Sequence, residues 1–490
     1  MRTLLAALLL VPSLASASTW YVAPTGKDTN AGTDALPFLT LQKAANSVKP
    51  GDTVIARAGT YRGFDVRVLG TASAPVLFKA DPGVTVNQDN PVNSHGINVE
   101  DSAYVTIDGF TVVGATRAGI RCALSPHVTV RRNTCDQNGY WGIFSGFCDD
   151  LLVEDNQTSR SVNEHGIYHS NSADRPIIRR NLSWGNRGNG IHMNGDLSQG
   201  GDGIISNARV EGNLVYENGA GGGSGINCDG VQDSVIQNNV LYDNHASGIS
   251  LYMIDAADGA RRNKILNNTI VMAAGSRWAI NIKDASTDAT VVNNILLNKG
   301  TRGSINITAD SLGGLVSSNN LVKDLFSPDD GNTFIGLAAW KTRTGQEQAS
   351  IVAGALASIF VSEPGHDLHL TAGSAAIDTG TANGAPSLDR DGRPRPLGAA
   401  LDIGAFEYCA GASCVAPPAD AGTASLDGSL ASGVDASVSA AGADAAASSA
   451  DGGTGAGAPD SGCGCGSASS AAPLVALAAL VLLRRRVGAR

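Results

Sequence analysis

The chain has 490 residues, of which 16% are charged, and its formal net charge is −10 at pH 7. The charge balance argues against a nucleic-acid-binding protein, because there is no basic patch to neutralise phosphates. Glycine is abundant at 60 residues, which is typical of a fold with many tight turns.

Residues 1–17 have the features of a secretory signal peptide. Arg2 supplies the positive start, Leu4 to Val11 form a short apolar core, and Ala15-Ser16-Ala17 is a small-residue cleavage site. A membrane anchor is the alternative, but the apolar run is far too short to span a bilayer. We therefore expect the mature chain to begin near Ser18 and to be exported.

Residues 20–63 are expected to close the N-terminal end of the domain that spans 18–408. Thr40 fits the N-cap of a short helix. Apolar residues follow it at helical spacing and would face inward: Leu41, Ala44, Ala45 and Val48. Such a helix would cover the core that the first coil of a repeat otherwise exposes.

Two markers recur in phase through residues 96–322, at steps of about 23 to 35 residues. The first is a Gly-Ile pair or a close substitute, beginning at Gly96, Gly119, Gly142, Gly166, Gly190, Gly225, Gly248, Ala279 and Ser304. The second is an asparagine, at Asn133, Asn156, Asn181, Asn213, Asn239, Asn268, Asn294 and Asn320. After each pair, apolar and polar residues alternate, which predicts a strand with one face in the core. The fold class is therefore all-β, a parallel β-helix whose coils stack to bury a shared core.

The asparagine column predicts a structural ladder. In stacked, equivalent turns, side-chain amides can hydrogen-bond from one coil to the next. We assign these asparagines to the fold rather than to catalysis.

Residues 326–408 are expected to form the closing coils and the second cap. Asp389, Asp391 and Asp402 suggest calcium, but the rest of an EF-hand loop is absent. Turn and cap roles are therefore favoured for these aspartates.

Residues 20–408 resemble right-handed parallel β-helix proteins of the pectate-lyase-like superfamily, in particular family 9 pectate lyases. The resemblance rests on Trp20 to Thr33, Pro37 to Ala45, Pro50 to Val54 and Ala58 to Arg62. It implies a single-stranded right-handed solenoid with an N-terminal capping helix. It does not fix the activity, because the superfamily contains lyases, hydrolases, epimerases, adhesins and inert scaffolds.

The C-terminal part changes composition. Residues 409–462 are mostly Ala, Ser, Gly, Asp and Pro, which predicts a disordered stalk. Residues 463–490 resemble a myxobacterial C-terminal sorting signal, with a cysteine motif, an apolar run and terminal arginines, which implies display on the cell surface. An uncleaved tail anchor is the alternative, and membrane contact is expected only through this segment.

Cysteine spacing favours buried thiols over zinc or disulfides within the coils. Cys122 and Cys228 share one inward position four coils apart, which at about 4.8 Å per coil is too far for a disulfide. Cys135 and Cys148 are also expected to be buried thiols. At the start of the stalk, we expect a local disulfide between Cys409 and Cys414.

The outward positions of the Gly-Ile strands carry the candidate site. The middle coils present candidate saccharide-binding residues between long loops: Tyr168, Asn194, Asn227, Tyr252 and Asn281. Either a saccharide groove or an ordinary solvated sheet face fits this pattern. His169 takes an inward position and should be packed. His165 lies at a coil corner, where Glu164 is expected to hold its tautomer.

Three functions remain open. The first is a polysaccharide lyase that cleaves a uronate polymer such as pectate by β-elimination, with Lys283 as the base and Arg121 and His192 as the next candidates. A surface lysine is the alternative for Lys283. The second is a non-catalytic adhesin or glycan-binding protein. The third is a glycoside hydrolase, which needs two carboxylates at a defined separation.

A calcium ion is implied only through the resemblance. Family 9 lyases are expected to hold calcium in a tight aspartate cluster, and Asp196, Asp229 and Asp233 match that cluster only in part. We expect a polysaccharide partner, no nucleic acid and a monomeric protein.

Overall fold

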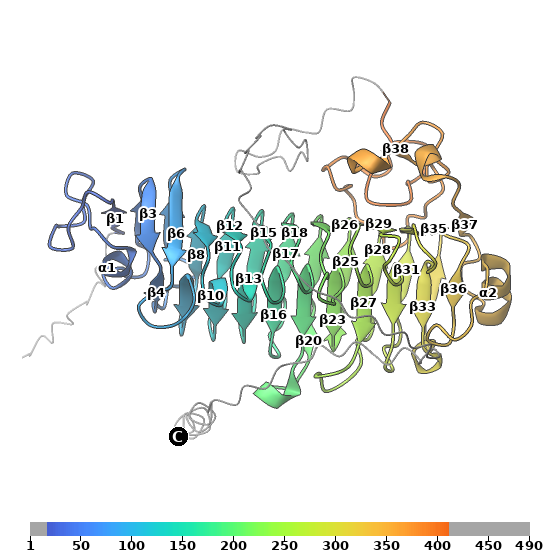
Figure 1. Cartoon of the computed structure of the whole chain (residues 1–490), viewed down its shortest axis with the longest axis horizontal. Helices are drawn as coiled ribbons and strands as arrows, with labels where there is room; N and C mark the ends of the chain where they lie inside the picture. Colours follow the sequence, from blue (N-terminus) through green and yellow to red (C-terminus); the bar gives the residue numbers. More distant parts are fainter. Residues whose placement is uncertain (1–16, 411–490) are drawn as a thin grey trace, which may run out of the picture. The chain divides into compact units, whose positions relative to one another are not determined.

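The computed structural model describes residues 17–410, and residues 19–352 form a right-handed parallel β-helix of about 12 turns, as predicted (Figure 1). Three long parallel sheets run along it, and each coil between the two ends contributes one strand to each sheet. The signal peptide (residues 1–16 of it), nearly all of the stalk, the sorting segment 463–490 and Cys414 lie outside the described residues. Within the described part, no helix is long and apolar enough to cross a membrane.

The Gly-Ile sheet contains the strands that follow the Gly-Ile marker. Its strands are β4 (Phe64–Val66), β7 (Ile97–Glu100), β10 (Ala118–Ala123), β13 (Trp141–Gly146), β16 (Ile167–Ser170), β19 (Ile191–Asn194), β23 (Ile226–Asp229), β27 (Ile249–Tyr252), β30 (Ile280–Ile282), β33 (Ile305–Ile307) and β36 (Phe326–Ser327).

The second sheet, called the β1 sheet, follows it in each coil. Its strands are β1 (Thr19–Val22), β2 (Thr53–Ala56), β5 (Val76–Ala80), β8 (Val105–Asp108), β11 (Thr129–Arg131), β14 (Leu152–Glu154), β17 (Ile177–Arg179), β21 (Arg209–Glu211), β25 (Val235–Gln237), β28 (Lys264–Leu266), β31 (Thr290–Val292) and β34 (Val316–Ser318).

The third sheet, called the β3 sheet, completes each coil. Its strands are β3 (Gly59–Arg62), β6 (Val84–Gln88), β9 (Thr111–Val113), β12 (Thr134–Asp136), β15 (Gln157–Ser159), β18 (Leu182–Trp184), β22 (Leu214–Tyr216), β26 (Val240–Tyr242), β29 (Thr269–Met272), β32 (Ile295–Asn298), β35 (Leu321–Val322) and β37 (Ile351–Val352). Two short sheets pair β20 (Ile205–Ser206) with β24 (Val231–Gln232), and β38 (Phe360–Ser362) with β39 (Asp367–Leu370).

The Gly-Ile marker has a packing explanation. The isoleucines stack in register from coil to coil, as in Ile167, Ile191 and Ile226, and are buried in the core. A Cβ atom added at Gly166 would lie 2.8 Å from the carbonyl oxygen of Gly190 in the next coil. The neighbouring backbone therefore leaves no room for a side chain at this corner.

The predicted asparagine ladder is confirmed. In each step, an amide nitrogen donates to the amide oxygen of the next asparagine; Asn239 Nδ2, for example, lies 2.9 Å from Asn268 Oδ1. The Asn239 oxygen accepts in turn from Asn213, again at 2.9 Å. A second, shorter ladder joins Asn186, Asn218 and Asn244. Other residues interrupt its column, so the sequence pattern does not predict it.

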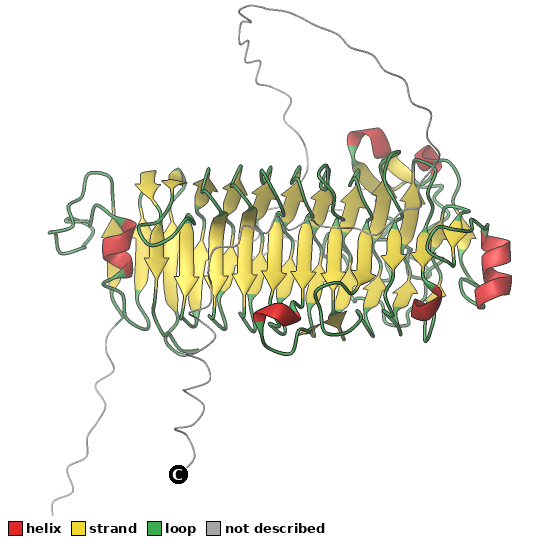
Figure 2. Cartoon of the chain, turned by 60° about the horizontal axis from the view of Figure 1, so that its bottom comes forward, coloured by secondary structure: helices red, strands yellow, loops and turns green. Residues whose placement is uncertain are grey.

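Helices close both ends of the solenoid (Figure 2). α1 (Leu41–Ala45) confirms the predicted N-terminal cap, since Thr40 accepts a hydrogen bond from Lys43 N and Leu41 is buried. At the other end, α2 (Leu337–Thr344) places Trp340 against Phe326, with ring centroids 4.9 Å apart.

Residues 353–408 do not stack as further coils. They fold back over the outer face of the β3 sheet and bury it in a second apolar cluster (Figure 1). This segment contains the one-turn helices η3 (Leu356–Ser358) and η4 (Glu363–Gly365). Asp389 and Asp402 accept hydrogen bonds from turn and cap backbone, which confirms the predicted roles of these two.

The cysteines of the coils are free and buried, as predicted. Burial raises the pKa of all four thiols. Cys409 is disulfide-bonded.

Candidate active site

The outer face of the Gly-Ile sheet carries the two predicted columns. Tyr168, His192, Asn227 and Ser250 stand in register on neighbouring strands. The second column aligns Asn194, Asp229 and Tyr252 in the same way. The period-two pattern therefore placed these side chains on the correct face.

Two long loops form one wall beside these columns. The loop with η1 (Leu197–Gln199) meets the loop after Tyr252, where Leu197 N donates to Asp255 O at 3.0 Å. Asp229 anchors the second loop, because its carboxylate accepts from Ile254 N and Asp255 N, both at 2.9 Å. Burial raises the pKa of Asp229 to about 6.

A directional chain of hydrogen bonds runs through two histidines. Asn189 N–H donates to His165 Nδ1 at 3.0 Å. A backbone amide can only donate, so His165 must carry its proton on Nε2. That proton points to His192 Nδ1 at 3.1 Å, which leaves the proton of His192 on Nε2, directed at Tyr252 Oη at 3.4 Å.

Tyr252 Oη accepts a second hydrogen bond, from Asn227 Nδ2 at 2.7 Å. Two neutral donors thus converge on one phenol oxygen. Asn227 and His192 therefore fix the position of this oxygen on the outer face of the Gly-Ile sheet.

Both histidines remain neutral at physiological pH. Burial lowers the pKa of His192 to about 3. Burial, and secondarily the charge of His192, also lowers the pKa of His165 well below its ordinary value. Neither imidazole is therefore suited to act as a base near neutral pH, and their role is to donate along the chain.

The His165 prediction needs one correction. Its tautomer is set by Asn189 N and not by Glu164, whose carboxylate lies 3.8 Å from His165 Nε2 and accepts from Trp141 Nε1 at 2.7 Å. His169 is packed inward as predicted, between Ser145 Oγ at 2.8 Å and Ala173 O at 2.9 Å.

Tyr168 forms an aromatic patch on this outer face together with Phe144. Its ring stacks on His192 with centroids 4.9 Å apart and meets Phe144 edge-on at 5.5 Å. Asn194 Nδ2 donates to Tyr168 Oη at 3.1 Å. Burial raises the pKa of Tyr168 to about 12, so this phenol stays protonated.

Lys283 and Arg121 lie away from the hydrogen bonds that His192 and Asn227 form with Tyr252. Lys283 Nζ forms an ion pair with Asp330 at 2.9 Å, so its amino group is directed at a protein carboxylate. Arg121 donates to Asn98 at 2.7 Å and pairs with Glu100 at 3.3 Å. Three strand steps separate Arg121 from His192, about 14 Å at the usual spacing. Asn281, one strand beyond Ser250, accepts from Asn306 Nδ2 at 2.8 Å.

The three aspartates predicted for calcium do not fit the ion. Asp229 is occupied by loop amides, Asp233 pairs with Arg262 at 2.6 Å, and Asp196 accepts from Ser198 N at 2.8 Å. Across residues 17–410, no group of three or more His, Cys, Asp or Glu side chains is arranged to hold a metal ion.

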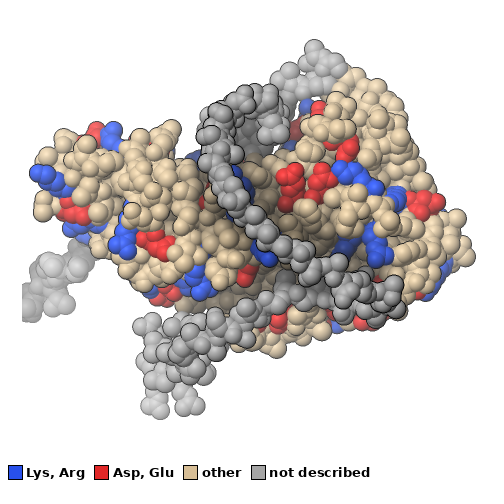
Figure 3. All heavy atoms as spheres, in the orientation of Figure 1, with Lys and Arg blue, Asp and Glu red and all other residues tan. Residues whose placement is uncertain are grey.

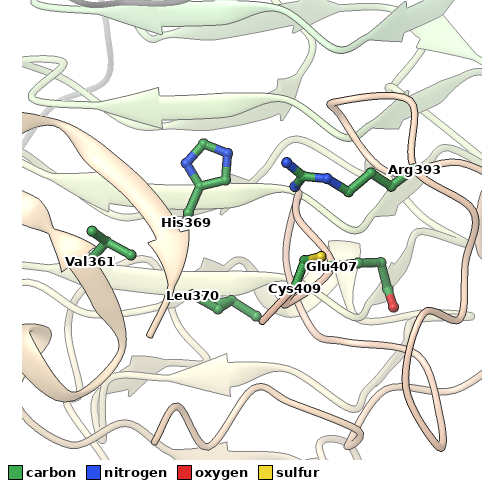
Figure 4. Close-up of a pocket in the computed structure, with 6 residues that line it drawn as sticks. All are labelled: Val361, His369, Leu370, Arg393, Glu407 and Cys409. Atoms are coloured by element: carbon green, nitrogen blue, oxygen red, sulfur yellow. The ribbon is translucent and has the colours of Figure 1, made fainter. Parts of the chain in front are cut away.

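A separate pocket of about 250 Å³ lies in the folded-back segment, lined by His369, Arg393 and Glu407 among others (Figure 4). His369 bonds to Asp367 at 2.6 Å and Asp391 at 2.9 Å, and Arg393 also pairs with Asp391. Glu407 pairs with buried Arg395 at 2.6 Å. These charged groups already have protein partners, so we assign them to the cap.

Comparisons with known proteins agree with the fold. The family described as "Right handed beta helix region" matches residues 155–322, and the family described as "Periplasmic copper-binding protein (NosD)" matches residues 81–200. The solved structure of pectate lyase Pel9A covers 81% of this chain and 98% of its own, with a TM-score of 0.57 and 18% identity. At that identity, the likeness shows the fold alone.

Two curated proteins are related in sequence. YwoF of Bacillus subtilis, named as uncharacterised, is 26% identical over 64% of this chain and 76% of its own. Pectate lyase PEL9 of Emericella nidulans is 38% identical over 14% of this chain and 17% of its own.

Proposed function

We propose that this protein is an exported polysaccharide lyase that cleaves a uronate polymer by β-elimination on the outer face of the Gly-Ile sheet. The observation that carries the proposal is the convergence of Asn227 Nδ2 and the neutral His192 imidazole on Tyr252 Oη. The fold, shared with pectate lyase Pel9A, supports it.

Tyr252 acts as the base in place of Lys283. The phenol first gives its own proton to solvent, and the two donors favour the resulting phenolate. The phenolate then takes the proton from C5 of the uronate, beside the carboxylate. The C4–O4 bond then breaks, a C4=C5 double bond forms, and the departing O4 takes a proton. The Tyr252 phenol supplies that proton when the C5 hydrogen and O4 lie on the same side of the sugar ring, and water supplies it when they lie on opposite sides.

Neutral donors take the place of a metal cation at the substrate carboxylate. The Asn227 amide has a second N–H, which we assign to the carboxylate as charge builds up there. Preorganised donors are effective in such a position, because they need not reorient during the reaction. Tyr168 and Phe144 supply the apolar surface on which the sugar ring rests.

The experiment is an absorbance assay for unsaturated products on pectate and on alginate, with and without a calcium chelator. We expect cleavage of one of the two polymers at a rate that the chelator leaves unchanged within about twofold. Loss of all activity with the chelator would overturn the metal-free mechanism. If neither polymer is cleaved but one is bound, the protein is a glycan-binding protein, a function that the aromatic patch also favours. Release of reducing ends without unsaturation would favour a glycoside hydrolase.

Export and surface display complete the proposal. They rest on the signal peptide in residues 1–17 and on the sorting segment 463–490. Deletion of residues 463–490 should release the protein from the cell surface into the medium. If the shortened protein stays on the cells, another segment anchors it.

A further inference from the structure

Arg117 differs from most arginines of the described chain. On the face shown in Figure 3, basic and acidic side chains are interspersed, and exposed arginines such as Arg160, Arg175 and Arg262 pair with carboxylates. The Arg117 guanidinium is exposed, and within residues 17–410 it forms no ion pair or hydrogen bond. It lies instead over Tyr140 and Trp141, with ring centroids 5.5 and 5.4 Å away.

An aromatic surface connects this arginine to the proposed site. Trp141 lies 4.7 Å from Phe144 between ring centroids, and Phe144 lies 5.5 Å from Tyr168. Tyr168 stacks in turn on His192 at 4.9 Å. The surface crosses β13, β16 and β19, so it runs along the axis of the solenoid.

From these contacts, we propose that Arg117 binds a carboxylate of the uronate polymer several sugar units away from the bond that is cleaved. The inference rests on the proposed function for its substrate. A guanidinium fixed over two rings keeps its N–H edge available, and that edge matches a carboxylate in a two-pronged hydrogen bond. Sugar rings between Arg117 and His192 would pack their C–H faces on Phe144 and Tyr168, which are partly exposed, while Trp141 lies buried beneath Arg117.

The charge of the protein explains why such a site is useful. The net charge of −10 opposes an anionic polymer, so a local cation is needed to hold it. Glu164 interacts electrostatically with Arg117, but its carboxylate accepts a hydrogen bond from Trp141 Nε1 at 2.7 Å and forms no ion pair with the guanidinium. Arg117 precedes β10, three strand steps from the His192 strand, or about 14 Å. Only a substrate of several sugars can therefore reach both points.

The test compares Arg117→Ala and Arg117→Lys with the wild type, on long polyuronate and on short oligouronates. We expect Arg117→Ala to raise KM for the long polymer about tenfold and to leave kcat within about twofold. Arg117→Lys should give an intermediate KM, because it keeps the charge but loses the two-pronged geometry. Short oligouronates should show no difference between the variants.

Arg160→Ala is the matched control, because its guanidinium lies 5.4 Å from the Trp184 ring centroid but on the β3 sheet. It should leave KM unchanged. An equal rise in KM for Arg160→Ala, or an unchanged KM for Arg117→Ala, would overturn the inference.

Equilibrium binding of polyuronate separates this inference from the proposed function. If the wild type cleaves the polymer but Arg117→Ala binds it equally well, the function stands and the inference fails. If the wild type binds without cleaving and Arg117→Ala weakens that binding, the inference stands and the lyase proposal fails. A wild type that neither binds nor cleaves polyuronate overturns both.

Discussion

The outer faces of the Gly-Ile sheet and the β3 sheet belong to the same repeat but are used in opposite ways. The β3 face carries apolar side chains such as Tyr242, Val271 and Leu297, and residues 353–408 cover it. The Gly-Ile face instead carries the polar side chains of His192, Asn227 and Tyr252, which are hydrogen-bonded to one another.

The difference shows how a solenoid separates stability from function. Both sheets present inward residues to one core, which tolerates little change. The outward positions vary independently, because side chains alternate between the two faces of a strand. One outer face is thus available for packing and the other for chemistry.

The largest difference in stability should come from replacing one phenylalanine on each of the two outer faces. Phe360 is 1% exposed in the cover over the β3 face. We expect Phe360→Ala to lower the free energy of unfolding by about 3–5 kcal/mol, measured by denaturant titration. Phe144→Ala, on the open face, should cost less than about 1 kcal/mol. Similar losses for the two variants would remove the distinction between the faces.

Replacing a residue of the asparagine ladder should cost nearly as much folding stability. Asn239→Ala removes amide bonds to Asn213 and Asn268 and should cost about 1–3 kcal/mol. Asn163→Ala, which removes an exposed bond to Gly139 O, should stay within about 0.5 kcal/mol. A wild-type melting curve for Asn239→Ala would show that the ladder does not stabilise the fold.

His165 should matter for rate as well as for stability, because it also accepts the buried N–H of Asn189. His165→Leu removes the donor to His192 Nδ1 and frees its tautomer, so kcat should fall about tenfold. His165→Gln retains an N–H donor and should recover part of that loss. The control is His95→Leu, since His95 accepts from Ala118 N at the same place in its coil but has no histidine neighbour in the site. Equal kcat losses in His95→Leu and His165→Leu would mean that the effect is only structural.

The smallest effect concerns pH and the folded-back segment. Burial lowers the pKa of His369, but bonds to and charges on Asp391 and Asp367 outweigh burial and raise it above its ordinary value. The stabilisation is therefore complete below the unfolded pKa, near 6.5, and is lost as pH rises through the raised folded value. The melting temperature should fall slightly between pH 6 and 9, and His369→Gln should remove this part of the slope. A slope that His369→Gln leaves intact would assign it to other groups.

The features of the fold that depend on a regular repeat could be predicted from the sequence. The coils, the main ladder and the outward columns all follow from repeats that can be counted along the chain. Contacts between distant loops could not be found in this way. The ion pair of Lys283 depends on Asp330, which lies about 50 residues further along the chain. The hydrogen bond from Ile254 N to Asp229 depends on the conformation of the loop after Tyr252.

The histidine chain shows a middle case. The sequence shows His165 and His192 as polar residues on neighbouring coils. Their contact is not predicted, because His165 lies at a turn, where the alternation of a strand does not indicate which way a side chain points. The signal that could have found it is the shared position of His95 and His165 immediately before the glycines of their coils. A histidine at that corner can accept the backbone amide of the next coil.

The most direct test of the central claim is the turnover of Tyr252→Phe on the polyuronate that the wild type cleaves. The variant keeps the ring but loses the oxygen on which Asn227 and His192 converge. We predict a loss of at least about 100-fold in kcat, with polymer binding retained. Tyr216→Phe, on the packed β3 face, should keep the wild-type rate. Full activity of Tyr252→Phe would contradict the account and place the base elsewhere.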